Sequence, residues 1–102
     1  MTEAVLLALG NDAETLAFWL GRAHAVAELA ATDAPTPEDA PALARSRLAS
    51  WLRDWHRSAL GELGEAVSCP PTVLAILGDA AESVDWRVVA GRLLAYREGE
   101  GL

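Results

Sequence analysis

Apolar residues recur every three to four positions along most of the chain, a spacing that predicts amphipathic helices rather than strands. The clearest case spans residues 12–31. Its first apolar face comprises Leu16, Trp19, Leu20, Ala23, Val26, Ala27 and Ala30. A second stripe comprises Phe18, Arg22, Ala25 and Leu29. A helix with two apolar stripes lies centrally in a bundle or buries its second stripe on another chain.

Residues 40–63 repeat the pattern with a basic outer side. The predicted inward face comprises Leu48, Leu52, Trp55, Ala59 and Leu63, flanked by His56. The opposite arc includes Arg47, Arg53, Asp54 and Arg57. The four tryptophans, Trp19, Trp51, Trp55 and Trp86, fall on or beside inward faces, so most are expected in the core. Trp51 lies at the edge of its stripe and is the tryptophan that we expect to be exposed.

Shorter helices are predicted at residues 3–9 and from Pro71 to Ala80. A last helix is predicted after Ser83 and ends at about Arg97. Asn11 is the expected N-cap of the helix in residues 12–31, and Ser83 the expected N-cap of the last helix. Residues 32–41 contain three prolines and three acids and form the expected linker, with regular helix resuming near Ala40. Residues 98–102 are expected to fray.

The composition agrees with an all-α fold. The chain has 102 residues, the size of one domain, and 52% of them are hydrophobic. Alanine (21 residues) and leucine (16) dominate, whereas valine, isoleucine and threonine together number 13. Strong helix formers with few β-branched residues disfavour a sheet. We therefore expect residues 1–102 to form a single domain, a compact bundle of four or five helices.

Charge is distributed in blocks. The net charge is −7, and all eight bases are arginine. Acids outnumber bases seven to one in residues 1–44, and residues 58–86 hold five acids and no base. A chain of this sign is expected to avoid DNA, RNA and anionic membranes, and to prefer a basic protein surface.

Candidate catalytic and metal-binding groups are sparse. Cys69 is the single cysteine; it precedes a predicted helix start, but no histidine is close in sequence. His24 and His56 fall on different predicted helices, and neither has a zinc-site spacing. We expect no catalytic residue, metal or cofactor; an enzyme that uses Cys69 or a histidine is the least favoured alternative. The lack of a basic leader and of a long apolar run predicts a cytoplasmic protein.

One segment resembles known proteins. Residues Ser83 to Leu94, with Asp85 and Trp86 as the distinctive letters, resemble the ending of various small phage- and plasmid-encoded proteins. The size and acidity of the chain are similar to those of anti-CRISPR and anti-restriction proteins. This resemblance implies an inhibitor that occupies a nuclease or its nucleic-acid channel, and it assigns no site residues.

The leading hypothesis is therefore a non-catalytic acidic inhibitor that docks on a basic, nucleic-acid-binding protein such as a CRISPR effector. Its expected contacts are the carboxylates Glu28, Asp33, Glu38 and Asp39, with Trp51, Arg47 and Arg53 as an anchor. The same acids are also typical of an ordinary solvated surface. The alternative function is a helical adaptor, or a homodimer, that pairs through the stripe of Phe18, Ala25 and Leu29.

Overall fold

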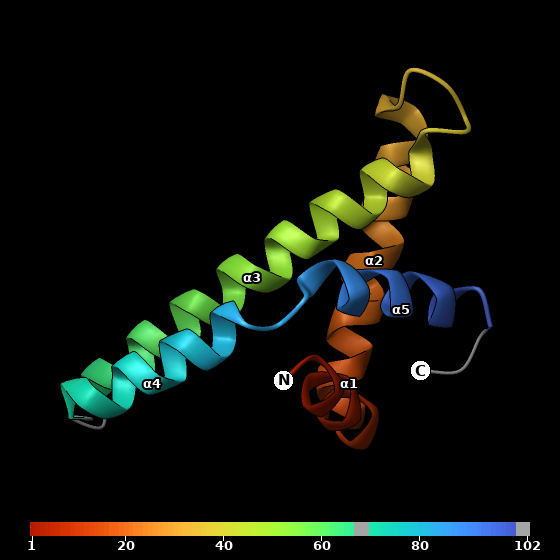
Figure 1. Ribbon diagram of the computed structural model, residues 1–102. Helices are drawn as coiled ribbons and strands as arrows, with labels where there is room; N and C mark the ends of the chain where they lie inside the picture. The colour runs from red at the N-terminus through yellow and green to blue at the C-terminus, as the bar shows by residue number, and fades with distance from the viewer. Residues whose placement is uncertain (67–69, 100–102) are drawn as a thin grey trace.

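The computed structural model describes residues 1–66 and 70–99, and all regular structure in these ranges is helical (Figure 1). The five helices are α1 (Thr2–Asn11), α2 (Ala13–Asp33), α3 (Ala40–Ala66), α4 (Pro71–Glu82) and α5 (Trp86–Arg97). The prediction of an all-α bundle with four or five helices is confirmed.

A single residue, Asp12, separates α1 from α2 and caps the second helix. Its backbone is extended (φ −118°, ψ 101°), and its carboxylate accepts hydrogen bonds from the amides of Glu14 (3.1 Å) and Thr15 (3.3 Å). Asn11, the predicted cap, instead lies in the last turn of α1. The prediction was wrong by one position because adjacent Asn and Asp are equally good N-caps.

Asp85, rather than the predicted Ser83, caps α5. Its carboxylate accepts from the amides of Arg87 (3.2 Å) and Val88 (3.3 Å). Ser83 ends α4 instead, and its hydroxyl donates to the carbonyl of Ala80 at 2.6 Å. The amide of Asp85 donates to Thr2 Oγ1 at 2.8 Å, which ties the start of α5 to the start of α1.

The connection between α2 and α3 covers only residues 34–39, because both helices extend into the predicted linker. Regular helix resumes at Ala40, as predicted. Within the connection, the Thr36 hydroxyl donates to Asp39 Oδ2 (2.9 Å), and the Asp39 amide donates to the Thr36 carbonyl (3.1 Å). Pro41 is tolerated because the amides of a first helical turn have no intrahelical acceptor.

The core lies where α2, α3 and α5 pack against one another. Its largest fully buried side chains are Trp19, Leu48, Leu52, Val89 and Leu93. Three alanines, Ala23, Ala30 and Ala90, are also fully buried and let the helix axes approach closely. α1 covers one end of this core through Leu6 and Leu9 and contacts both α2 and α5.

α3 is longer than the helices that cover it. Its 27 residues extend about 40 Å, whereas the 12 residues of α5 extend about 18 Å. The second half of α3 therefore projects beyond the core, where α4 packs along it as an arm (Figure 1). Arg57 of α3 donates a hydrogen bond to Glu82 of α4, and this bond and the Glu82 charge raise the pKa of Arg57.

Replacing a core leucine should be far more costly than replacing an exposed one. Leu48→Ala is expected to lower the free energy of unfolding by about 2–5 kcal/mol, because it leaves a cavity at a fully buried site. Leu29→Ala, at a side chain that is 60% exposed, should change it by no more than about 0.5 kcal/mol. Urea denaturation checks both; equal losses would contradict the assignment of the core.

The Asp12 cap should make stability depend on pH. Hydrogen bonds from the backbone and side chain of Thr15 lower the pKa of Asp12 below its usual value of 3.8. A carboxylate with a lowered folded-state pKa stabilises the fold above its unfolded-state pKa and loses that effect as pH falls through the folded-state value. Asp12→Asn keeps a capping oxygen but cannot titrate in this range.

We therefore expect the wild type to be more stable than Asp12→Asn at pH 6, with the difference shrinking as pH falls below 3.8. Thermal denaturation at a series of pH values measures this. A difference that stays constant down to the lowest pH would contradict the role given to the Asp12 charge.

Candidate protein-binding face

Three large aromatic side chains are exposed where α2 meets α3. Phe18 of α2 is 44% exposed, and Trp51 and Trp55 of α3 are 46% and 50% exposed. Beneath them lies buried Trp19, in edge-to-face contact with Phe18 (ring centroids 5.1 Å apart) and with Trp55 (5.8 Å). With Arg22, these exposed residues form what we call the aromatic face: Phe18, Arg22, Trp51 and Trp55.

Arg22 lies at the centre of the aromatic face. Its guanidinium carbon is 4.5 Å from the centroid of the Trp51 ring and 5.3 Å from that of Phe18. A cation over an aromatic ring is attracted by the ring's quadrupole, and Arg can stack there while its N–H groups still reach solvent. The contact joins α2 to α3 and holds Trp51 in place.

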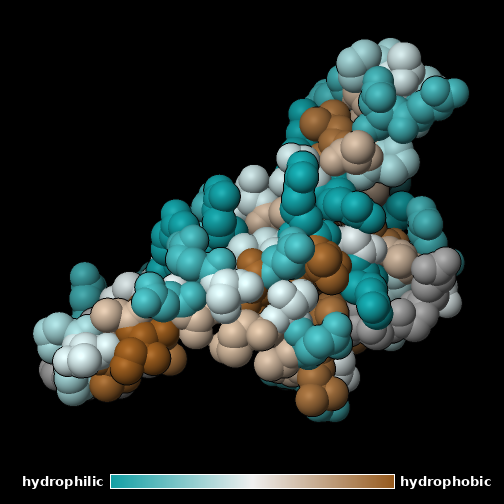
Figure 2. Space-filling view, viewed as in Figure 1, coloured by the Kyte–Doolittle hydropathy of each residue, from teal (hydrophilic) through white to brown (hydrophobic). Residues whose placement is uncertain are grey.

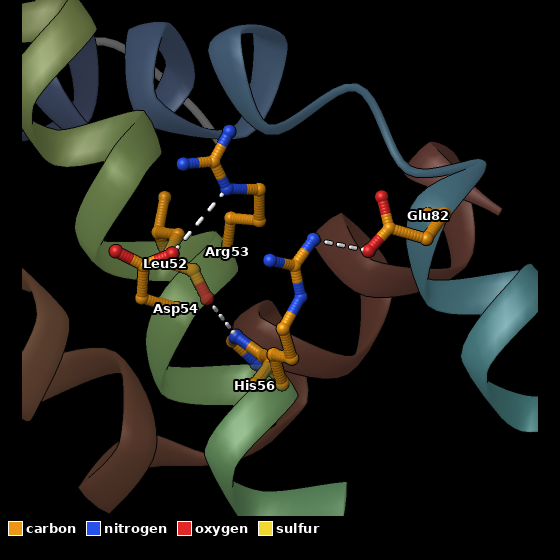
Figure 3. Close-up of polar contacts among 6 residues, drawn as sticks. Leu52, Arg53, Asp54, His56 and Glu82 are labelled. Atoms are coloured by element: carbon orange, nitrogen blue, oxygen red, sulfur yellow. Dashed lines mark hydrogen bonds and ion pairs between the residues drawn. The ribbon is translucent and has the colours of Figure 1, made fainter. Parts of the chain in front are cut away.

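A shallow hollow of about 410 Å³ opens on the aromatic face, and Asp54 and Ser58 of α3 complete its lining. Asp54 is not a free acid, because its Oδ1 lies 3.4 Å from Arg53 Nε (Figure 3). The hollow therefore presents aromatic surface with one cation and one partly neutralised carboxylate at its edge. This composition suits a protein contact better than it suits a charged small ligand.

The exposure of Trp51 is confirmed, whereas the expected burial of Trp55 is wrong. Trp55 shares the inward stripe of Leu48 and Leu52, but at this level of α3 the inward position is taken by the next residue, His56, whose ring stacks on buried Trp19 and Trp86. The ring neighbours of Trp55 are Phe18, Trp19 and the adjacent His56, which leave half of its surface open. A helical stripe shows which residues share a side, but it does not show which of two adjacent residues at the edge of that side packs into the core.

His56 has a structural position beside this face. Its ring stacks between Trp19 (centroids 6.0 Å apart) and Trp86 (4.7 Å). Nδ1 lies 2.6 Å from the carbonyl oxygen of Leu52 (Figure 3). Since a carbonyl only accepts, Nδ1 carries the proton in this arrangement. The ring is a partly buried link between α2, α3 and α5.

The four predicted acidic contacts, Glu28, Asp33, Glu38 and Asp39, are exposed near the end of α2 and in the connection that follows. Three of them have partners within the chain. Asp33 accepts a 2.9 Å hydrogen bond from Arg47, and Glu28 lies 3.4 Å from His24. Asp39 accepts from Thr36. The predicted acidic surface therefore exists, but part of its charge is satisfied internally.

The structure gives Trp51 a different cation from the two that were predicted. Arg47 reaches Asp33, and Arg53 lies beside Asp54 and lines a separate hollow with Trp86. The cation on Trp51 is Arg22. The apolar pattern did not indicate Arg22 and Trp55 as surface residues, although an arginine inside an apolar stripe is a sign of an unusual face.

The expectations on metal binding, on Cys69 and on membrane spans concern the described residues only in part. Among the described residues, no group of three His, Cys, Asp or Glu side chains could hold a metal ion. Cys69 lies outside the described residues, so the structure does not bear on it. In the described part of the chain, no helix combines the length and apolar character needed to cross a membrane.

Comparison with known proteins returned no family model, curated protein or solved structure that matches this chain.

Arg22 and Trp51 should be energetically coupled. Arg22→Ala and Trp51→Leu, singly and together, form a double-mutant cycle for the cation–π contact. We expect a coupling of about 0.5–1 kcal/mol in the free energy of unfolding, the usual value for an exposed pair. Urea denaturation of the four proteins measures it. Strictly additive losses would show that the arginine does not organise the aromatic face.

Proposed function

We propose that this protein acts without catalysis, by binding another protein through the aromatic face. The observation that carries the proposal is the grouping of half-exposed Phe18, Trp51 and Trp55 around Arg22. Aromatic residues and arginine are the types that dominate binding energy at protein interfaces. Their buried support, Trp19, holds the face rigid, which lowers the entropy lost on binding.

The charge of the chain indicates which partner would suit this face. At −7, the protein is attracted to a basic surface, and exposed Glu28 and Glu38 lie on the α2 and connection side of the molecule. Charge complementarity of this kind speeds association and is weakened by salt. We therefore propose an inhibitor that covers a basic nucleic-acid-binding surface. A defence protein such as a CRISPR effector is the first candidate target, with the inhibitor encoded by a mobile element.

A second candidate function is an adaptor or structural subunit that oligomerises through α2. One observation favours it: the second stripe of α2 is uncovered, with Phe18 44% and Leu29 60% exposed. A contact made by that stripe would be apolar and would respond little to salt.

Affinity purification from the host lysate, at low and at high salt, tests both functions. The inhibitor proposal predicts a stoichiometric nucleic-acid-binding partner that is lost at high salt. Glu38→Lys should weaken capture several-fold, since it replaces an attraction by a repulsion. Glu65→Lys, an equal charge change at an exposed site on the arm, is the matched control and should weaken it less.

Salt and Glu38→Lys separate the two candidates, whereas Phe18→Glu should weaken both, because Phe18 belongs to the aromatic face and to the second stripe of α2. A self-complex or partner complex that survives high salt and Glu38→Lys, but is lost in Phe18→Glu, would favour the adaptor. Capture of the same partner by all variants, at equal yield, would contradict both functions.

A further inference from the structure

A second apolar surface lies away from the aromatic face, between α1 and α4. We call it the α1–α4 groove, and its volume is about 300 Å³. Met1 and Val5 line its α1 side, and His56, Ala59 and Leu60 of α3 form its floor. The remaining side consists of Leu77, Ala80 and Ala81 of α4, followed by Val84 and Trp86. Every lining residue except His56 is hydrophobic.

The hydrophobic surface continues outside the groove. On α4, Val73, Ile76 and Leu77 are 41%, 64% and 37% exposed, and Leu7 of α1 is 68% exposed. Figure 2 shows this surface in brown over α4 and again over α1, with paler residues between them. The exposed apolar residues of α4 are close together on one helix, and exposed apolar surface gathered in one place often marks an interaction site.

The groove has one end closed by packed side chains and one wall formed by a helix. At the closed end, His56 stacks on Trp86 with ring centroids 4.7 Å apart, and Val84 is 6% exposed. The α4 wall consists of Leu77, Ala80 and Ala81, in the second half of that helix. An amphipathic helix lying along α4 could place its apolar side chains in such a groove.

The acidic residues on the elements around the groove favour an occupant with a positive charge. Residues 58–86, which include all of α4, carry Glu62, Glu65, Asp79, Glu82 and Asp85 and no base. α1 adds Glu3. Arg57 of the floor helix and Glu82 pair with each other, so these two charges offset and the other four acids of residues 58–86 set the sign of this region. A second copy of this chain, at −7, and a lipid with an anionic headgroup would both be repelled here.

We propose that the α1–α4 groove binds a cationic amphipathic helix of a partner protein. The apolar side chains of that helix enter the groove, and its lysines or arginines meet the acids of α3 and α4. The groove does not share a lining residue with the aromatic face. The inference therefore goes beyond the proposed function and stands or fails separately from it.

Two neighbouring residues of α4 supply a matched test. Leu77 lines the groove, whereas Ile76, although more exposed, does not. The probe is a blocked Leu/Lys amphipathic peptide of about 14 residues, long enough to lie along α4. Its affinity is measured by isothermal titration calorimetry. A peptide with glutamate in place of every lysine is the charge control.

We expect the Leu/Lys peptide to bind the wild type. Leu77→Ser should weaken its affinity about tenfold, whereas Ile76→Ser should weaken it less than about threefold. The Leu/Glu peptide should not bind. Trp51→Leu, on the aromatic face, should leave peptide affinity unchanged. Equal losses in Leu77→Ser and Ile76→Ser, equal binding of both peptides, or no binding to the wild type would each overturn the proposal.

A second variant keeps the test informative if Leu77→Ser destabilises α4. Ala80→Arg puts a cation into the lining, where it would repel the lysines of the peptide and fill part of the groove. It should abolish binding while circular dichroism shows unchanged helix content. Retained affinity in a folded Ala80→Arg protein would overturn the groove as the binding site.

Discussion

The length of α3 relative to the helices that cover it is the constraint on which the arm and the α1–α4 groove depend. α2, α3 and α5 bury a common core around Leu48, Leu52 and Leu93, but α3 continues well beyond it. The part of α3 that projects is left with apolar and aromatic side chains that no core receives. The aromatic face borders one stretch of this helix, and the floor of the α1–α4 groove is another. The groove is a consequence of that overhang, whereas the aromatic face lies over the core, beside buried Trp19 and Leu52.

Many of the arginines interact with other residues of the chain, which reduces the positive charge that the surface offers to a partner. Several are committed within the chain: Arg47 pairs with Asp33, Arg57 pairs with Glu82, and Arg22 stacks on Trp51. Arg45 lies flat against Gly91, where an added Cβ would sit only 3.1 Å from its guanidinium nitrogens. The basic side predicted for α3 is therefore used to hold helices together. What remains on the surface is mainly acidic, and this favours a basic partner.

Periodicity alone could predict the helices, their number and most of the core, because each helix has a strong apolar stripe and clear end signals. It could not choose between neighbouring cap residues, so Asn11 and Ser83 were predicted where Asp12 and Asp85 act. It also could not show that His56, rather than Trp55, takes the inward position at that level of α3. The pairing of Arg22 with Trp51 joins two helices, and a single-helix pattern contains no information on such contacts.

The central claim is that the aromatic face is open in the free protein and covered in its functional complex. Hydroxyl-radical footprinting, read by mass spectrometry at each tryptophan before and after partner capture, tests it most directly. In the free protein, exposed Trp51 and Trp55 should be oxidised readily and buried Trp19 should be protected. In the complex, Trp51 and Trp55 should become protected by a large factor while Trp19 stays unchanged. Equal oxidation of Trp51 and Trp55 with and without the partner would contradict the account.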